Sequence, residues 1–200
     1  LIEPNGLLCA SENLSASLLL DAYIQGIFPW FSEGEPVLWW SPNPRMVLFL
    51  DEFKCSRSLT RVLKNAHYQV VLNAHFAKVI HECASSARKN QNGTWIDAPI
   101  KQSYGALFQA GFAHCVETWI DEKLVGGLYG VAIGNMFYGE SMFSLVDNAS
   151  KIAFAHLVYF LKNQQIENNV ISPMIQAKNK QPSVFVIFVV NKKKKKRSKT

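Results

Sequence analysis

Gly134-Asn-Met-Phe-Tyr-Gly-Glu-Ser-Met-Phe-Ser-Leu-Val-Asp-Asn-Ala-Ser-Lys151 is the segment around which the rest of the chain is organised. It places a single acid, Glu140, between the bulky apolar pairs Met136-Phe137 and Met142-Phe143. Burying a carboxylate among such side chains costs free energy unless the group is hydrogen-bonded or protonated. Desolvation raises the pKa of a buried acid toward neutrality, which suits a general base. The alternative is a core strand in which Glu140 only bonds a backbone group or pairs with an arginine.

The residues after Glu140 predict a turn and a helix. Asp147 or Asn148 fits the N-cap position, because either side chain can accept a hydrogen bond from a free backbone N–H group. The apolar run Ile152 to Leu161 then forms the body of the helix, which we expect to end near Asn163. The unit therefore indicates a place where a polar substrate is held beside a base.

The residues before Glu140 predict a β-hairpin, with strands at residues 114–120 and 124–133. Gly126, Gly127 and Gly130 lie inside the second strand, where glycine indicates a bulge or a close backbone approach. These glycines do not form a phosphate-binding loop, because neither GxxxxGK[ST] nor a GxGxxG that opens a helix is present.

Hydrophobic spacing and capping residues predict the other elements. Helices are expected at residues 15–25, 57–66, 76–87 and 99–111, and strands at residues 37–40, 46–50 and 68–72. Ser15 and Ser56 fit the N-caps of the first two helices. The segment Pro42-Asn43-Pro44 holds the backbone extended and predicts that a small N-terminal domain, residues 1–45, ends there.

The composition excludes several classes of protein. A hydrophobic fraction of 48% is ordinary for a globular core, and no apolar run reaches the ~18 residues that a membrane helix needs. The four cysteines are scattered, so no zinc site is expected. The net charge of +6 comes from residues 168–200, which hold nine of the 21 Lys/Arg and no acid.

Arg57, Arg61 and Lys64 fall on one face of a predicted helix, at positions i, i+4 and i+7. We call these three residues the basic stripe. Such a stripe suits contacts with phosphates of a nucleic acid. An ordinary solvated helix face fits the same pattern equally well.

The motifs that carry a family resemblance occur in one order along residues 3–167. They are Phe28-Pro29-Trp30-Phe31, Trp39-Trp40-Ser41-Pro42-Asn43-Pro44-Arg45, Gly93-Thr94-Trp95-Ile96, Gly126-Gly127-Leu128-Tyr129-Gly130, Met136 through Ser144, and Asn148-Ala149-Ser150-Lys151. Together they resemble the leucyl/phenylalanyl-tRNA–protein transferase family. The resemblance implies an α+β fold: a small N-terminal domain and a GNAT-like acyltransferase domain with a central, mostly antiparallel sheet, here residues 46–167.

The resemblance also implies an activity. The family transfers Leu or Phe, and sometimes Met, from aminoacyl-tRNA to the N-terminal Arg or Lys of an acceptor protein. The product is marked for N-end-rule degradation. No metal or coenzyme is used, since the aminoacyl ester is already activated. A cytoplasmic monomer that does not bind membranes is therefore expected, with aminoacyl-tRNA and acceptor proteins as its partners.

Site residues follow from the resemblance one by one. Glu140 matches the catalytic glutamate, and the basic stripe matches a helix that touches the acceptor stem. Trp30, Trp95 and Phe137 match the family's aromatic residues around the aminoacyl group and the terminal adenosine. Leu128, Leu157 and Leu161 match further apolar residues of the pocket. Ser144 matches a serine beside the pocket.

The chain departs from the family pattern after Glu167. The family continues with an Asp-Cys-Gln segment that supplies a catalytic glutamine, and at that spacing this chain has Ser172. We therefore predict that residues 168–200 are a disordered basic tail foreign to the family, and that transfer is impaired.

Three alternatives stay open on the sequence alone. The first is a non-catalytic remnant that binds aminoacyl-tRNA or protein N-termini. The second is a membrane-surface or RNA-binding role for residues 183–200. The third, an acetyl-CoA-dependent acetyltransferase, fits less well, because Val146-Asp147-Asn148 is acidic where a pyrophosphate would bind.

Overall fold

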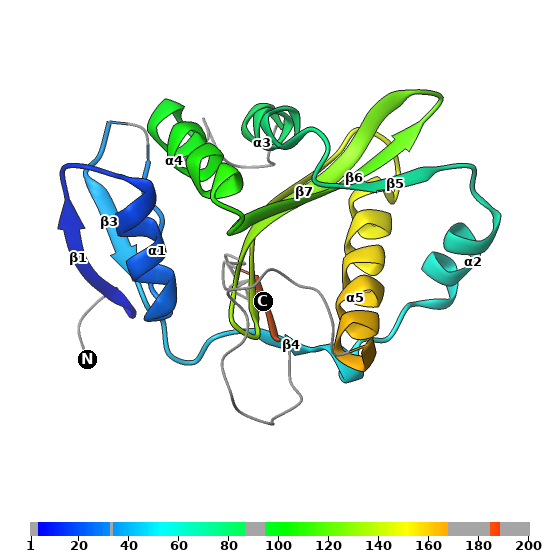
Figure 1. The fold of residues 1–200 in the computed structure, drawn as a ribbon, viewed down its shortest axis with the longest axis horizontal. Coiled ribbons are helices and arrows are strands. Elements are labelled where there is room, and N and C mark those ends of the chain that lie inside the picture. Colours follow the sequence, from blue (N-terminus) through cyan, green and yellow to red (C-terminus); the bar gives the residue numbers. More distant parts are fainter. Residues whose placement is uncertain (1–3, 33, 87–94, 168–184, 189–200) are drawn as a thin grey trace, which may run out of the picture.

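The protein is described here by a computed structural model that covers residues 4–32, 34–86, 95–167 and 185–188 (Figure 1). Its strands are β1 Leu7–Ser11, β2 Phe28–Pro29, β3 Val37–Trp40, β4 Val47–Phe49, β5 Gln69–Leu72, β6 Ala113–Ile120, β7 Lys123–Ile133, β8 Met136–Ser144 and β9 Phe185–Phe188. Its helices are α1 Ala16–Ile24, the short 3-10 helix η1 Leu50–Glu52, α2 Arg57–Asn65, α3 Phe76–Ser85, α4 Ala98–Gln109 and α5 Ala149–Glu167.

Two sheets organise these elements. The first has the order β1-β3-β2 and is antiparallel; the second has the order β4-β9-β8-β7-β6-β5 and is antiparallel except where β8 pairs with β9. The predicted α+β class with a mostly antiparallel central sheet is therefore confirmed. The chain passes from one sheet to the other between Trp40 and Val47, close to the domain boundary that we predicted at residue 45.

The central sheet is covered on both faces. Figure 1 shows α3 and α4 on one face and α5 on the other, with the three-stranded sheet and α1 beside α4. No helix in the described residues is long and apolar enough to cross a membrane.

Two buried clusters fill the interior. The one on the α3–α4 side, which we call the tyrosine cluster, includes Tyr23, Tyr104, Tyr129 and Tyr138 and extends into the three-stranded sheet. The one on the α5 side, which we call the leucine cluster, consists of Leu50, Val116, Leu128, Phe137, Ala153, Leu157, Val158 and Leu161. The small N-terminal sheet thus shares a core with the face of the sheet that α3 and α4 cover.

Local signals explain where the helices begin. Ser15 accepts a hydrogen bond from the Leu18 N–H group at the start of α1, and Ser56 does the same for Leu59 at the start of α2. Both predicted caps are confirmed. Asp97, which was not predicted as a cap, accepts from Ile100 at the start of α4, with Pro99 in the first turn.

The β7–β8 pair contains the predicted irregularity. Tyr129 pairs with Ser141 and Gly130 with Gly139, so that Glu140 is the extra residue of a β-bulge. A side chain at Gly130 would collide with the Tyr138 carbonyl and the Phe137 ring. The bulge therefore sets the direction of the Glu140 side chain, and glycine opposite it makes the close approach possible.

The long helix α5 begins against the sheet and ends later than predicted. A Cβ atom at Gly126 would overlap Ala149 at the start of α5, so glycine allows the helix to sit directly on β7. The helix continues to Glu167 rather than ending near Asn163, because no glycine or proline interrupts the segment.

The predicted tail contributes one strand. Phe185–Phe188 forms β9 between β4 and β8, which corrects the prediction of disorder for these four residues. Aromatic and β-branched residues favour a strand. The rest of residues 168–200 lies outside the described residues.

Replacing Gly130 tests the packing at the bulge. Gly130→Ala should lower the free energy of unfolding by about 1–3 kcal/mol, the usual cost of forcing extra atoms into a packed core. Denaturant unfolding measures this change. Gly105→Ala in α4 is the control, since a Cβ atom there meets nothing within 4 Å, and it should raise stability by about 0.5–1 kcal/mol. Equal effects of the two substitutions would contradict the role given to Gly130.

Candidate functional site

Glu140 is buried, and two tyrosines bind its carboxylate. It is 7% exposed. The Tyr23 hydroxyl donates to Oε1 at 2.5 Å, and the Tyr104 hydroxyl donates to Oε2 at 3.2 Å. The two hydroxyls also lie 2.5 Å from each other. The carboxylate is therefore bonded by side-chain phenols, rather than by the backbone group or the arginine that the alternative required.

Three distant segments meet at this point. Glu140 comes from the bulge in β8, Tyr23 from α1 and Tyr104 from α4. Tyr138, also from β8, donates to the Tyr23 carbonyl at 3.0 Å and so fixes α1 against the strand. Tyr23 and Tyr104 lie within helices that the sequence predicts, at residues 15–25 and 99–111, but nothing in the sequence signalled that both would face Glu140.

The electrostatics of this group favour proton uptake near neutral pH. Burial raises the pKa of Glu140 to about 7, although the hydrogen bonds from Tyr23 and Tyr104 act in the opposite direction. Burial and the charge of Glu140 also raise the pKa of both tyrosines well above the usual value, so both remain donors.

Tyr23, Tyr104 and Glu140 make three oxygen–oxygen contacts with one another, but the two phenols supply only two protons. Two hydroxyl protons serve three oxygen–oxygen contacts while Glu140 is ionised. Protonation of Glu140 supplies a third proton, so that every contact can hold one. The group can therefore accept a proton without breaking its own geometry.

Two of the predicted aromatic residues lie on the same side of the sheet. Trp30 and Trp95 are half-buried and pack against the tyrosine cluster. Trp40 lies 5.6 Å from Trp30, centroid to centroid, and its indole N–H donates to the Trp30 carbonyl at 2.6 Å. Both predicted tryptophans therefore share a cluster with the partners of Glu140.

The other predicted pocket residues gather on the opposite face. Leu128, Phe137, Leu157 and Leu161 all belong to the leucine cluster, and each is at most 7% exposed. They lie between the sheet and α5. The structure thus brings these four together but assigns them to a different cluster from Trp30 and Trp95.

Ser144 has a structural position at the end of β8. Its hydroxyl donates to the Val146 carbonyl at 2.9 Å and accepts from the Ser150 N–H group at 3.2 Å. Asn148, one of the two predicted caps, has φ of 67° and accepts from Lys151 Nζ. Ser144 therefore serves the start of α5 in the way that we predicted for Asp147 or Asn148.

The basic stripe lies on α2, as predicted. Arg57, Arg61 and Lys64 are all exposed, and α2 has no buried residue. Figure 1 shows α2 beyond α5, at the end of the molecule opposite the three-stranded sheet. The stripe is therefore available to a large partner, although it is not next to Glu140.

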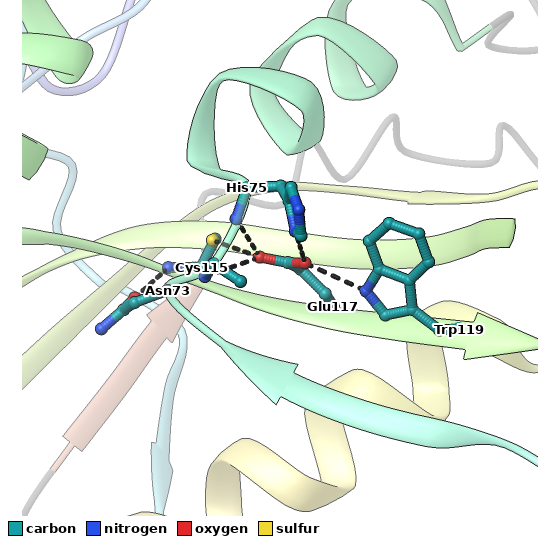
Figure 2. A network of polar contacts seen from close by, with 6 residues as sticks. Asn73, His75, Cys115, Glu117 and Trp119 are labelled. Atoms are coloured by element: carbon teal, nitrogen blue, oxygen red, sulfur yellow. Dashed lines mark hydrogen bonds and ion pairs between the residues drawn. The ribbon is translucent and has the colours of Figure 1, made fainter. Parts of the chain in front are cut away.

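A second buried carboxylate, which sequence reasoning missed, lies on β6. Figure 2 shows Glu117 with its neighbours. Its Oε1 accepts from the backbone N–H groups of Ala74 and His75, at 3.0 and 2.6 Å, and from the Cys115 thiol. Its Oε2 contacts the His75 ring at 2.9 Å and accepts from the Trp119 indole at 3.0 Å.

This network attaches α3 to the sheet. His75 is the N-cap of α3 but makes no side-chain cap of its own; the carboxylate of Glu117 instead fixes the backbone N–H groups of Ala74 and His75, directly before the helix. Burial acts to raise the pKa of Glu117, but the hydrogen bonds from His75, Trp119 and Cys115 outweigh it, and the pKa is lower than usual. Glu117 is thus a fixed anion at a helix N-terminus.

Comparisons with known proteins agree with one another. The family described as leucyl/phenylalanyl-tRNA protein transferase matches residues 47–177, and the N-terminal domain described for the same transferase matches residues 12–43. The first of these matches ends beyond residue 167, where we predicted that the resemblance ends.

Curated relatives carry the same name, leucyl/phenylalanyl-tRNA–protein transferase. The one from Nitrosomonas eutropha is 57% identical over 164 residues, which cover 82% of this chain and 70% of the relative. The one from Nitrosospira multiformis is 54% identical over 167 residues, covering 84% and 72%, and the one from Chromobacterium violaceum is 54% identical over 166 residues, covering 83% and 71%.

The lowered pKa of Glu117 predicts how stability depends on pH. Its contribution is fully present above the unfolded-state pKa, about 4.3, and is lost as the pH falls through the folded-state value. Glu117→Gln should lower the free energy of unfolding at pH 7 by about 2–3 kcal/mol, because bonds to an ionised group are lost. In denaturant melts from pH 3 to 8, the free energy of unfolding should fall less on acidification in Glu117→Gln than in the unmodified chain. Glu52→Gln, which is exposed, is the control; an identical response in the two variants would contradict this role.

Proposed function

Because this chain belongs to the leucyl/phenylalanyl-tRNA–protein transferase family, we propose that it transfers Leu, Phe or Met from aminoacyl-tRNA to the N-terminal Arg or Lys of acceptor proteins. The α-amine attacks the ester carbonyl, an amide bond forms, and the ester bond to the tRNA breaks. The amine loses a proton, and the ribose oxygen that leaves gains one.

The observation that carries this proposal is the proton-accepting group at Glu140. An N-terminal amine has a pKa of about 7.7–8.0 and must be neutral to attack. A carboxylate whose pKa is about 7 is well matched to accept that proton at neutral pH. Tyr23 and Tyr104 hold the carboxylate in place, and the proton that Glu140 takes up is returned to the ribose oxygen that leaves.

The aminoacyl group binds among apolar side chains. Trp30 and Trp95 form the part of this pocket on the side of Glu140, and Phe137 from β8 belongs to the part on the opposite face of the sheet. Leu128, Leu157 and Leu161 form its aliphatic base beneath the sheet, and Ser144 fixes the turn beside it. A pocket of this kind distinguishes side chains that differ by one methylene by only about 1–3 kcal/mol, so a preference for Leu and Phe with some acceptance of Met is reasonable.

The basic stripe binds the acceptor stem of the tRNA. Each Lys or Arg that neutralises a phosphate releases a counterion, so these exposed cations give affinity without sequence selection. The aminoacyl ester is already activated for transfer, and the reaction therefore proceeds without metal or coenzyme. We place the protein in the cytoplasm, where aminoacyl-tRNA is present, as a monomer that marks acceptor proteins for N-end-rule degradation.

A second candidate function is binding without transfer. It rests on the sequence after Glu167, where Ser172 stands at the spacing of the family's catalytic glutamine. We propose that turnover is reduced for this reason. The deciding experiment measures transfer of radiolabelled Leu from Leu-tRNA to a peptide with N-terminal Arg, with an N-terminal Ala peptide as control. The chain is assayed as it is and with residues 168–200 replaced by the matching segment of the Nitrosomonas eutropha relative.

Activity only after replacement supports impaired transfer. If the unchanged chain transfers Leu as fast as the chain with residues 168–200 replaced, the proposed impairment is contradicted. No transfer in either form, with tRNA still bound, supports the binding function instead.

Glu140→Gln tests the proton acceptor. In the active form, kcat should fall by about 100-fold or more, the usual contribution of a general base. The rise in rate centred near pH 7 should disappear and leave only the rise set by the amine's own pKa of about 7.7–8.0. Single-turnover transfer rates from pH 5.5 to 8.5 measure both effects. Glu52→Gln provides a matched exposed control, and an unchanged pH profile in Glu140→Gln would remove Glu140 from the mechanism.

Removing the basic stripe tests the tRNA contact. With Arg57, Arg61 and Lys64 all changed to alanine, tRNA binding should weaken, and the slope of log K against log salt should fall by about 2–3, near 0.9 for each lost phosphate contact. Single-turnover transfer at saturating tRNA should keep its rate. Lys123→Ala, at an exposed charge that is the first residue of β7, is the control. An unchanged salt slope would mean that the stripe is only a solvated helix face.

A further inference from the structure

The helix that carries the basic stripe is only weakly held by its own apolar side chains. α2 spans nine residues and has no buried residue. An isolated helix shorter than about 12–15 residues is marginal in water. Contacts made at its two ends therefore add to the partial burial of Leu59, Val62 and Leu63 in fixing its position.

The C-terminal end is attached through Tyr68. The Tyr68 hydroxyl donates to the Leu63 carbonyl of the last helical turn at 3.1 Å and lies 3.1 Å from Nε2 of His156 in α5. A phenol has one proton, so the hydroxyl that donates to Leu63 must accept from His156. His156 is therefore protonated at Nε2, and burial, which lowers its pKa, favours the neutral ring with that nitrogen as the donor.

The N-terminal end is attached through Cys55, the residue before the N-cap Ser56. The Cys55 thiol lies 3.4 Å from the Tyr159 hydroxyl of α5. Phe53 adds edge-to-face ring contacts with Phe154 at 5.5 Å and with Tyr159 at 6.1 Å. Aromatic pairs of this geometry contribute beyond their buried area.

Both attachments are made by one face of α5. His156 and Tyr159 are three residues apart, which places them side by side on a helix. The opposite side of α5 carries Leu157 and Leu161 into the leucine cluster, and the helix starts against Gly126 of β7. α5 therefore connects α2 to the strands that carry the proposed aminoacyl pocket.

We propose that His156 and Tyr159 of α5 hold α2 at both ends, through Tyr68 and Cys55, and so fix where the basic stripe meets the phosphates of aminoacyl-tRNA. These are positioning residues that do not touch the RNA themselves. The proposal rests on the tRNA-binding function given to the stripe. It predicts that the loss of one uncharged hydroxyl, that of Tyr68, alters an electrostatic property of tRNA binding.

The test uses fluorescein-labelled, uncharged tRNA specific for leucine and the full chain, so that the readout does not depend on catalysis. Tyr68→Phe removes the hydroxyl and leaves the ring. Binding should weaken about five-fold, the scale of one lost hydrogen bond, and the slope of log K against log salt should fall by about 1–2, because displaced cations reach fewer phosphates. Anisotropy titrations at several salt concentrations measure both.

His156 supplies a matched pair of variants. His156→Leu removes the donor and should behave like Tyr68→Phe. His156→Gln keeps an N–H donor near the position of Nε2 and should restore most of the affinity and the salt slope. His81→Leu, at an exposed site on α3, controls for the loss of an imidazole, and thermal melts show that each variant is folded at the assay temperature.

The outcomes distinguish tRNA binding by the basic stripe from the positioning of α2 by α5. If the triple stripe variant loses affinity while folded Tyr68→Phe binds like the unmodified chain with the same salt slope, the attachment of α2 does not position the stripe and this inference is overturned. A lower melting temperature without a change in slope overturns it as well, because the contacts are then purely structural. If the unmodified chain does not bind tRNA, the proposed function and this inference both fail.

Discussion

The hydrogen bonds from two phenols to the buried carboxylate of Glu140 are the interaction on which the packing of the two sheets depends. A buried acid needs donors, and neither of its donors comes from its own sheet: Tyr23 is on α1 and Tyr104 is on α4. Satisfying this group therefore joins the three-stranded sheet to the helices that cover the central sheet. The same contact that closes the core also produces an acid whose pKa is near 7, so stability and proposed chemistry share one site.

Two glutamates on this protein show how the donors decide the state of a buried acid. Glu117 is surrounded by backbone N–H groups, an imidazole and an indole, and these lower its pKa despite complete burial. Glu140 has two phenols as donors, and burial prevails. Glu117 is thus a permanent anion that anchors α3, whereas Glu140 exchanges its proton in the neutral range.

The helix α5 joins the two sides of the proposed function. One side of it packs into the leucine cluster, and another holds α2 by its ends through Tyr68 and Cys55. Because the basic stripe and the proposed aminoacyl pocket both depend on the position of this helix, the packing of α5 sets the distance between the proposed RNA contact and the proposed aminoacyl site.

The amino-acid sequence alone was enough to predict the helices α1 to α5 and the strands β3 to β8, though not β1, β2 or β9. It also predicted the caps at Ser15 and Ser56, the irregular hairpin beside Gly130 and the burial of Glu140, because these depend on local chemistry and on periodicity. Motif order also identified the family. Only the tertiary structure decided that Tyr23, 117 positions before Glu140, is its partner, that Ser144 bonds the start of α5, and that a strand from the predicted tail enters the sheet. Periodicity shows which face of an element is buried but not what it meets, since the partner across a core depends on how distant segments are packed.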